Sequence, residues 1–209
     1  VTPAERRQAL ATRRAALEAL DGDERRAAEK KLQKAAVRAV VALDAATGKP
    51  RWRQALDLVG AAGGFKWCSL GSMYKDGVLV LFGVYVDGHF WKEFFAGTFK
   101  DRLVTALSAQ DGSVLWRKKI GYRVRPLVIG DTLHAEPWAF DLRTGRRKTR
   151  TNPITGLEEP WQFARPGHHC GCPAAAPHLM VFRSFTLGWY DLVRDYGTKH
   201  FPTQRPGCW

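Results

Sequence analysis

The sequence predicts an all-β fold that is preceded by an α-helical hairpin. From about residue 39 onward the chain consists of short β-type runs between turn dipeptides, such as VLVLFGVYV between Asp76-Gly77 and Asp87-Gly88. A short turn motif also recurs along this part of the chain, whereas residues 1–38 show helical signals. Evenly spaced short strands with little helix are typical of a sandwich, a barrel or a propeller.

The N-terminal segment, residues 1–38, has the signals of two helices. Thr2-Pro3-Ala4-Glu5 has the form of a capping box with proline at the first helical position. Asp21-Gly22 then interrupts the pattern, and Asp23 can cap a second helix that reaches about Val37. Because the apolar stripe is thin and rich in alanine, we expect a hairpin that is an insertion or excursion packed lightly on the remainder.

The turn motif recurs at offsets that indicate a repeat. Its copies are residues 42–48 followed by Trp52, residues 106–112 followed by Trp116, residues 139–145 with Thr149 in the tryptophan position, and a looser copy at residues 189–197. The first two copies are separated by about twice the distance that separates the second from the third. The spacing therefore predicts a repeat with an insertion at about residues 60–100.

Each residue type in the motif suits a hairpin. The Asp44 side chain can accept hydrogen bonds from turn amides, and Gly48 supplies the positive φ that closes the turn. Ala42 leaves space for a neighbouring layer, and a ring such as Trp52 fills such a space. The residues expected to serve the repeat structurally are Asp44, Gly48, Trp52, Gly112, Trp116, Asp141, Gly145, Asp191 and Gly197.

The pattern A-x-D-x-x-T-G-x-x-x-W resembles the PQQ-like (quinoprotein) β-propeller repeat over about residues 37–201. The resemblance implies a partial β-propeller of about three to four four-stranded blades in residues 39–209. Since a closed ring needs about 4–8 blades, we expect a partial chain of a longer multi-blade protein. It also implies an extracytoplasmic location, in the periplasm or at the cell surface.

This family contains both enzymes and scaffolds, so the fold alone does not assign a function. Its dehydrogenases use an adjacent Cys-Cys disulfide, a calcium ion and a catalytic aspartate, and this sequence has no Cys-Cys pair. We therefore expect a non-enzymatic binding or assembly scaffold with a protein or small-molecule ligand on the propeller face. The alternative is a fragment of a PQQ-dependent oxidoreductase, in which PQQ and calcium belong to the full-length parent. The sequence identifies no catalytic or cofactor-binding residue.

A third hypothesis is a metal-binding propeller, because RPGHHCGCP gathers two imidazoles and two thiols. The candidate ligands, which would suit zinc or copper(I), are His168, His169, Cys170 and Cys172. A disulfide from Cys170 or Cys172 to Cys208 and plain buried thiols are the alternatives.

The net charge, two arginines and four aromatic residues each have a structural explanation as well as a functional one. The net charge of +13 invites nucleic-acid binding, but the arginines are scattered and form no basic stripe, which disfavours that partner. Arg165 and Arg205 could line an anion site or simply lie in Arg-Pro-Gly turns. Four aromatic residues are expected in the core rather than in a ligand platform: Trp67, Trp91, Phe94 and Phe95. No apolar run of the 209-residue chain is long enough to span a membrane.

Overall fold

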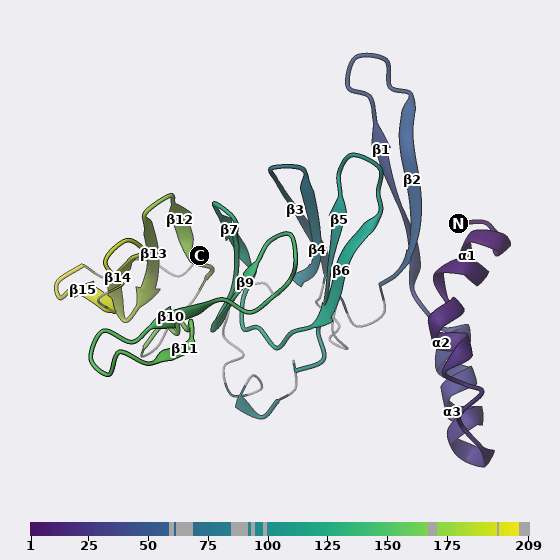
Figure 1. The fold of residues 1–209 in the computed structure, drawn as a ribbon, viewed down its shortest axis with the longest axis horizontal. Coiled ribbons are helices and arrows are strands. Elements are labelled where there is room, and N and C mark those ends of the chain that lie inside the picture. Colours follow the sequence, from purple (N-terminus) through teal and green to yellow (C-terminus); the bar gives the residue numbers. More distant parts are fainter. Residues whose placement is uncertain are drawn as a thin grey trace.

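The computed structural model describes residues 1–58, 61, 69–84, 92, 95–97, 100–166, 171–195 and 197–204. The chain runs from helices at one end through a series of antiparallel sheets to the C-terminal hairpins at the other (Figure 1). The prediction of an all-β body with N-terminal helices is confirmed.

The helices are α1 (Pro3–Ala9), α2 (Ala11–Ala15) and α3 (Gly22–Gln33). The expected capping box is present, because the Thr2 hydroxyl accepts from the Glu5 amide and the Glu5 carboxylate accepts from the Thr2 amide. The second helix differs from its prediction: Asp21 rather than Asp23 is at the N-cap, and the helix ends at Gln33. None of the described helices is long and apolar enough to cross a membrane.

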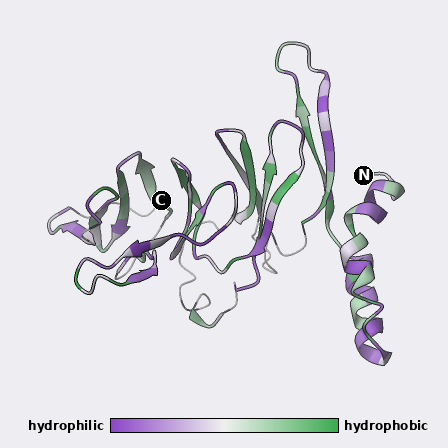
Figure 2. Cartoon of the chain, viewed as in Figure 1, coloured by the Kyte–Doolittle hydropathy of each residue, from purple (hydrophilic) through white to green (hydrophobic). Residues whose placement is uncertain are grey.

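Polar contacts attach the helices to the first sheet, and Figure 2 shows hydrophilic stretches along all three. This sheet consists of β1 (Val37–Leu43) and β2 (Pro50–Asp57). Glu5 pairs with Arg53 and Arg13 pairs with Asp57, at 2.7 and 3.1 Å. Since Trp52 alternates with these two β2 residues, its side chain lies on the opposite face of the sheet. The helices therefore lie on the side of the sheet that Trp52 does not use.

The second sheet has four strands in the order β3-β4-β5-β6. Their bounds are β3 (Ser69–Lys75), β4 (Val78–Val84), β5 (Leu103–Ser108) and β6 (Val114–Lys119). Residues 69–84 fall within the stretch expected as an insertion, yet they form half of this meander. The long spacing between the first two motif copies is thus accounted for partly by ordinary strands.

The third and fourth sheets continue the meander. The third is β7 (Leu127–Ile129), β8 (Thr132–Ala135) and β9 (Trp138–Asp141), extended by an isolated bridge between Phe140 and Arg147. The fourth is β12 (Ala174–Ala176), β13 (Leu179–Ser184), β14 (Thr186–Asp191) and β15 (Thr198–Phe201). Between them lies a separate added hairpin, β10 (Thr149–Thr151) and β11 (Glu158–Pro160).

The hydrophobic core consists of clusters that join successive sheets. Val80, Phe82 and Trp116 of the second sheet pack with Leu133 and Phe140 of the third. A second cluster joins the first and second sheets, and a third centres on the fourth sheet. Each sheet is therefore stabilised mainly by burying one face against the next.

Candidate functional site

The first and third motif turns share one hydrogen-bonding pattern. Asp44 accepts from the amide and the hydroxyl of Thr47, both at 2.9 Å, and Asp141 accepts from the same groups of Thr144, both at 2.7 Å. The threonine hydroxyl is the main reason that the pKa of each aspartate lies below its ordinary value. The amide of Gly48 donates to the Asp44 carbonyl at 2.8 Å. These carboxylates are engaged within their own turns.

A further copy of the turn lies in the added hairpin, at residues 152–156. The Asn152 side chain accepts from the amides of Ile154 and Thr155, at 2.9 and 3.1 Å. Gly156 has φ +71° and its amide donates to the Asn152 carbonyl at 2.9 Å. This copy is not among the sequence-predicted ones because asparagine replaces aspartate, although the Asn-x-x-Thr-Gly spacing is a usable signal.

The last copy differs from its prediction at the glycine position. Asp195, and not Gly197, is the residue whose amide donates to the Asp191 carbonyl, at 3.0 Å. Asp195 has φ +53°, in the left-handed region that glycine favours. A carboxylate therefore projects from the place that glycine occupies in the other aspartate-led turns.

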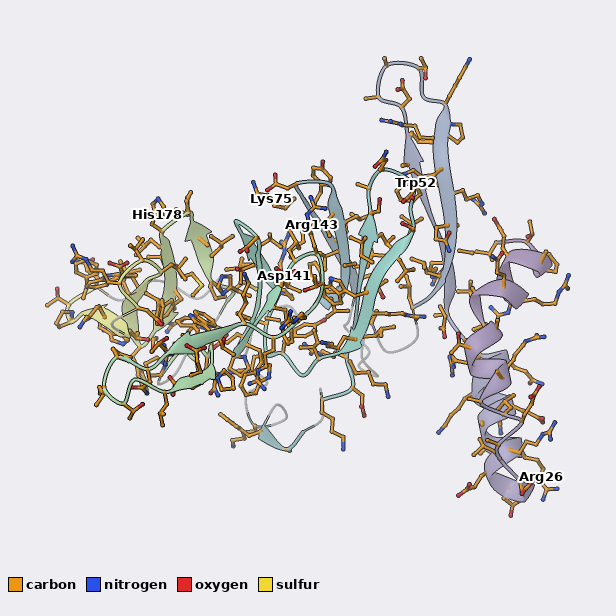
Figure 3. All side chains as sticks on the ribbon, viewed as in Figure 1. Arg26, Trp52, Lys75, Asp141, Arg143 and His178 are labelled. Carbon is orange, nitrogen blue, oxygen red and sulfur yellow. The ribbon has the colours of Figure 1, made fainter. Side chains whose placement is uncertain are left out.

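Tryptophan and glycine of successive copies are in contact. A Cβ on Gly112 would lie 2.6 Å from the Trp52 ring, and a Cβ on Gly145 would lie 2.7 Å from the Trp116 ring. The indole N–H of Trp52 donates to the Ala109 carbonyl at 2.8 Å, and that of Trp116 to the Leu142 carbonyl at 2.9 Å. Figure 3 shows Trp52 between the first and second sheets.

The position of the rings refines the sequence interpretation. Ala42 is the cross-strand neighbour of Trp52 within the first sheet, and Ala106 is that of Trp116 within the second. Each tryptophan ring therefore does not fill a space left by these alanines. It packs over the turn glycine of the next sheet, Gly112 or Gly145. Glycine is required there for two reasons, the positive φ and the close approach of the indole.

Another side chain links the second and third sheets at their turns. Arg143 donates to the Asp76 carbonyl at 2.5 Å, across to the β3–β4 turn where Lys75 also lies (Figure 3). Thus the turn of the third motif copy contacts the second sheet twice, through Arg143 and through Gly145.

The contact between the third and fourth sheets uses different chemistry. Thr149 holds the tryptophan position, and its neighbour Arg150 pairs with Asp195 at 3.0 Å. Arg150 also donates to the Tyr190 hydroxyl at 3.2 Å and to Glu159 at 2.9 Å. An arginine–aspartate pair therefore stands where the earlier interfaces have tryptophan over glycine.

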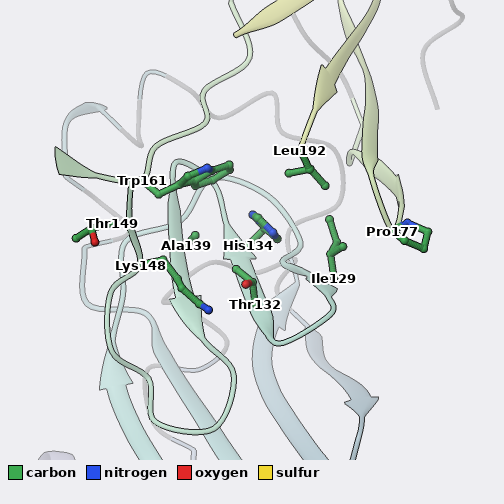
Figure 4. Close-up of a pocket in the computed structure, with 9 residues that line it drawn as sticks. All are labelled: Ile129, Thr132, His134, Ala139, Lys148, Thr149, Trp161, Pro177 and Leu192. Atoms are coloured by element: carbon green, nitrogen blue, oxygen red, sulfur yellow. The ribbon is translucent and has the colours of Figure 1, made fainter. Parts of the chain in front are cut away.

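A pocket of about 240 Å³ opens at this third interface (Figure 4). Its lining comes from the third sheet, the added hairpin and the turns of the fourth sheet: Ile129, Thr132, His134, Ala139, Lys148, Thr149, Trp161, Pro177 and Leu192. His134 and Trp161 are not among the sequence-predicted site residues, because neither belongs to the repeat.

His134 and Trp161 form the inner wall of this pocket. Their rings meet edge to face with centroids 4.8 Å apart. Burial lowers the pKa of His134 to about 4, so the imidazole is neutral near pH 7. Within the described part of the chain, its Nδ1 atom is buried and has no hydrogen-bond partner. The wall thus offers an aromatic surface, whereas the Nδ1 atom is enclosed by the protein.

Lys148 lies at the polar edge of the pocket. Its ammonium group is 2.8 Å from the Asp131 carboxylate and 3.9 Å from that of Asp141. The Lys148 hydrogen bond is the main reason that the pKa of Asp131 is lowered. The cation at this edge is therefore already compensated.

A second polar cluster is buried beside the third sheet. Glu136 accepts from the Arg165 amide at 3.0 Å and from the Arg165 Nε at 3.1 Å. Arg123 pairs with the same carboxylate at 3.4 Å. Arg165 also donates to the Gly171 carbonyl at 2.8 Å, and its side chain is fully buried. Arg165 therefore anchors a loop and does not line an accessible anion site.

Several predicted site residues fall outside the described part of the chain: His168, His169, Cys170, Cys208, Arg205, Trp67, Trp91 and Phe94. Cys172 is described and is a free thiol. Phe95, expected in the core, is 71% exposed. Among the described residues, no three His, Cys, Asp or Glu side chains are close enough to hold a metal ion. The Cys/His loop stays a prediction.

A meander of antiparallel strands repeated from sheet to sheet, with each sheet packed on the next through its motif, defines the blades of a β-propeller. The chain has the fold of a partial β-propeller. No family model matches the sequence, and no curated protein matches it.

Two solved propeller structures resemble the chain. The crystal structure of BamB from Moraxella catarrhalis is 16% identical with a TM-score of 0.43, and the match covers 77% of this chain and 42% of BamB. A europium-containing methanol dehydrogenase is 20% identical with a TM-score of 0.35, and the match covers 52% of this chain and 20% of the dehydrogenase. The chain thus spans less than half the length of either protein, and at these identities the likeness concerns the fold alone.

Proposed function

We propose that this chain is a non-enzymatic propeller scaffold that binds a protein partner outside the cytoplasm. The extracytoplasmic location rests on the resemblance of the repeat to the PQQ-like propeller repeat. The scaffold role rests on the use that the structure makes of the repeat. Its aspartates hold turns and its tryptophans join blades, so the repeated side chains support architecture.

The observation that carries the binding proposal is the tip of the added hairpin. β10 and β11 form a two-stranded sheet of their own, which extends from the third sheet beyond the bridges Phe140–Arg147 and Trp138–Gln162. Ile154 is 92% exposed and Leu157 is 69% exposed in the connecting turn. Two exposed large apolar side chains on one turn suit insertion into an apolar pocket of a protein partner. The turn hydrogen bonds of Asn152 hold this tip in one conformation, which reduces the entropy lost on binding.

Site-specific photo-cross-linking in the full-length protein tests the partner. A cross-linker at Ile154 should yield one defined adduct, identified by mass spectrometry, in the cells that produce the protein. Ala46 is the matched control, because it is exposed and holds the equivalent place in the first motif turn. The Leu157→Ser variant should remove the Ile154 adduct without lowering the melting temperature. Equal labelling at positions 154 and 46 would contradict the proposal.

Cofactor titration tests the enzymatic alternative. The full-length protein should show neither saturable PQQ binding in tryptophan fluorescence with calcium present nor dye-linked alcohol oxidation. Saturable binding with turnover would replace the scaffold by an oxidoreductase. Fractionation of the cells tests the location, and recovery of the protein in the cytoplasmic fraction would contradict it.

A further inference from the structure

The first sheet corresponds to one half of the second sheet. Ala42 pairs with Trp52 in the first sheet, and the register shifts directly after Ala42. Ala106 pairs with Trp116 in the second sheet, with the same shift after Ala106. β1 and β2 are therefore equivalent to β5 and β6. However, β5 also pairs with β4, whereas within the described part of the chain β1 pairs with β2 alone (Figure 1). We call the other side of β1 the open edge.

The hairpin hydrogen bonds show which backbone groups point to the open edge. The Asp44 amide donates across the hairpin to the Lys49 carbonyl at 2.8 Å, so Asp44 points to the β2 side. Successive residues of a strand direct their N–H and C=O groups to opposite edges. The amides of Ala39, Val41 and Leu43 therefore point to the open edge, where they are available to a further strand.

The second sheet shows which kind of strand such an edge accepts. The residues equivalent to Val41 and Leu43 lie opposite Leu81 and Leu79 of β4. An antiparallel neighbour is also present beside the motif strand in the third and fourth sheets, as β8 and β13. The complement of β1 is therefore an antiparallel strand with aliphatic residues opposite Val41 and Leu43.

The residues that precede β1 in the sequence do not supply this strand. They form the three helices, and the Glu5–Arg53 and Arg13–Asp57 pairs attach these helices to β2. The helices are thus held to the strand on the far side from the open edge.

A second observation, on β3, indicates the same vacancy. Leu70 and Tyr74 lie on the face of the second sheet that carries Leu79 and Leu81 and packs on the first sheet. Leu70 is nevertheless 44% exposed and Tyr74 is 66% exposed. Val128, which faces the preceding sheet from β7, packs against the core. Since the first sheet has only the equivalents of β5 and β6, no described strand lies opposite β3.

We propose that the open edge of β1 accepts an apolar β-hairpin of a protein partner. One strand of the hairpin pairs antiparallel with β1, and the other lies opposite Leu70 and Tyr74, which completes a sheet like the second one. β1 suits strand addition, because it contains no proline and Arg38 is its single charged residue. This surface is separate from the tip of the added hairpin and does not depend on the scaffold proposal.

Amide exchange measured by NMR tests the pairing. The probe is a synthetic peptide with the sequence of residues 69–84, because this hairpin complements the equivalent edge of β5. Saturating peptide should slow the exchange of the Ala39, Val41 and Leu43 amides at least about tenfold. The amides of Val40 and Ala42, which point to β2, should be unaffected. Unchanged exchange at the three outward amides would overturn the proposal.

A matched pair of variants tests the backbone contact. Val41→Pro removes an outward N–H without breaking a bond to β2, so the chain should keep its melting temperature. Its affinity for the peptide should fall at least about tenfold. Val41→Thr keeps the N–H and introduces the residue found at the equivalent position 105, so it should bind like the unaltered chain. Undiminished binding by folded Val41→Pro would contradict strand addition.

A modified peptide covers the case in which Val41→Pro fails to fold. N-methylation of Leu81 removes the peptide N–H that would face β1, and it should weaken binding to the unaltered chain at least about tenfold. Equal affinity of the two peptides would overturn the proposal.

Exchange in the purified full-length protein identifies the source of the hairpin. Without peptide, the Ala39, Val41 and Leu43 amides should exchange rapidly at all protein concentrations. Protection that appears only at high concentration would show that a second copy covers the edge. Protection at every concentration would show that the same molecule covers it, and either result would overturn a partner hairpin.

Discussion

The indole of Trp116 lies so close to Gly145 that a Cβ on this glycine would come within 2.7 Å of the ring. The two residues belong to successive copies of the repeat and to successive sheets. Gly48 has nearly the same φ, +67° against +65°, but nothing within 4 Å of the Cβ position. Alanine substitutions at these two glycines therefore distinguish two losses of stability. One comes from the left-handed backbone conformation, and the other comes from contact with the indole ring.

Gly145→Ala should destabilise the chain more than Gly48→Ala. Both variants place alanine in the left-handed region, which costs about 1–2 kcal/mol. Only Gly145→Ala forces the indole to move, which adds about 1–3 kcal/mol as in an overpacked core. Urea denaturation of both variants measures the difference.

Trp116→Ala shows whether the additional cost of Gly145→Ala comes from the indole ring. It should cost about 3–5 kcal/mol alone, and in its background Gly145→Ala should cost no more than Gly48→Ala. If the Gly145→Ala penalty is unchanged without the ring, the tryptophan–glycine contact does not join the sheets.

Arg165→Met should cost about 3–5 kcal/mol, because it leaves Glu136 buried with one of its partners removed. Arg26→Met is the control, since Arg26 forms an exposed pair with Asp23 on α3 (Figure 3) and should change the free energy of unfolding by less than about 1 kcal/mol. Chemical denaturation measures both values. Similar small effects would show that the Glu136 cluster does not anchor the loop.

His134 should make the protein less stable as the pH falls from about 6.5 to about 4. Its pKa is about 4 in the folded chain and 6.5 in the unfolded chain, so in this window the unfolded chain binds the proton and the folded chain does not. Stability is therefore complete above the unfolded pKa and is lost on acidification, by up to about 3 kcal/mol. Melting temperatures across this range measure the loss.

His134→Phe should flatten this pH dependence. His178→Phe is the comparison, because His178 is exposed in the turn between β12 and β13 and should leave the dependence intact. Identical pH profiles for the two variants would rule out His134 as the group responsible.

The Cys/His loop is predicted to bind zinc or copper(I). Equilibrium dialysis of the reduced chain should recover about one metal ion per chain, as expected for thiolate and imidazole ligands. Cys172→Ser and His169→Gln should each reduce the bound metal, whereas His178→Phe should not. Unchanged metal content in the loop variants, or none in the unaltered chain, would contradict the site.

The sequence was sufficient for the local structure of the repeat. Aspartate and glycine at fixed spacing specify the turns, since each acts through its own backbone neighbourhood. The partner of each tryptophan was less accessible, because Gly112 lies 60 residues from Trp52 and only the stacking of sheets brings them together. Residues 69–84 were read as an insertion for the same reason, since their strands pair with β5 through tertiary structure.

The pocket could not be predicted from the repeat. His134 and Trp161 acquire their role from the way that the third sheet, the added hairpin and the fourth sheet meet. The sequence carried a related sign, since the third copy has threonine in the tryptophan position. Without the structure, Asp195 was not recognisable as the residue in the glycine position, because Gly197 lies nearby.

The position of the N-terminal helices restricts how the ring of blades can be extended. They lie beside the lower part of β1–β2 (Figure 1) and are held to its outer face by the Glu5–Arg53 and Arg13–Asp57 pairs. Any blade added at this end, whether from the same polypeptide or another molecule, would first have to displace them. The two faces of the first sheet are thus unequal, because one is joined to the second sheet through Trp52 and the other carries the helices.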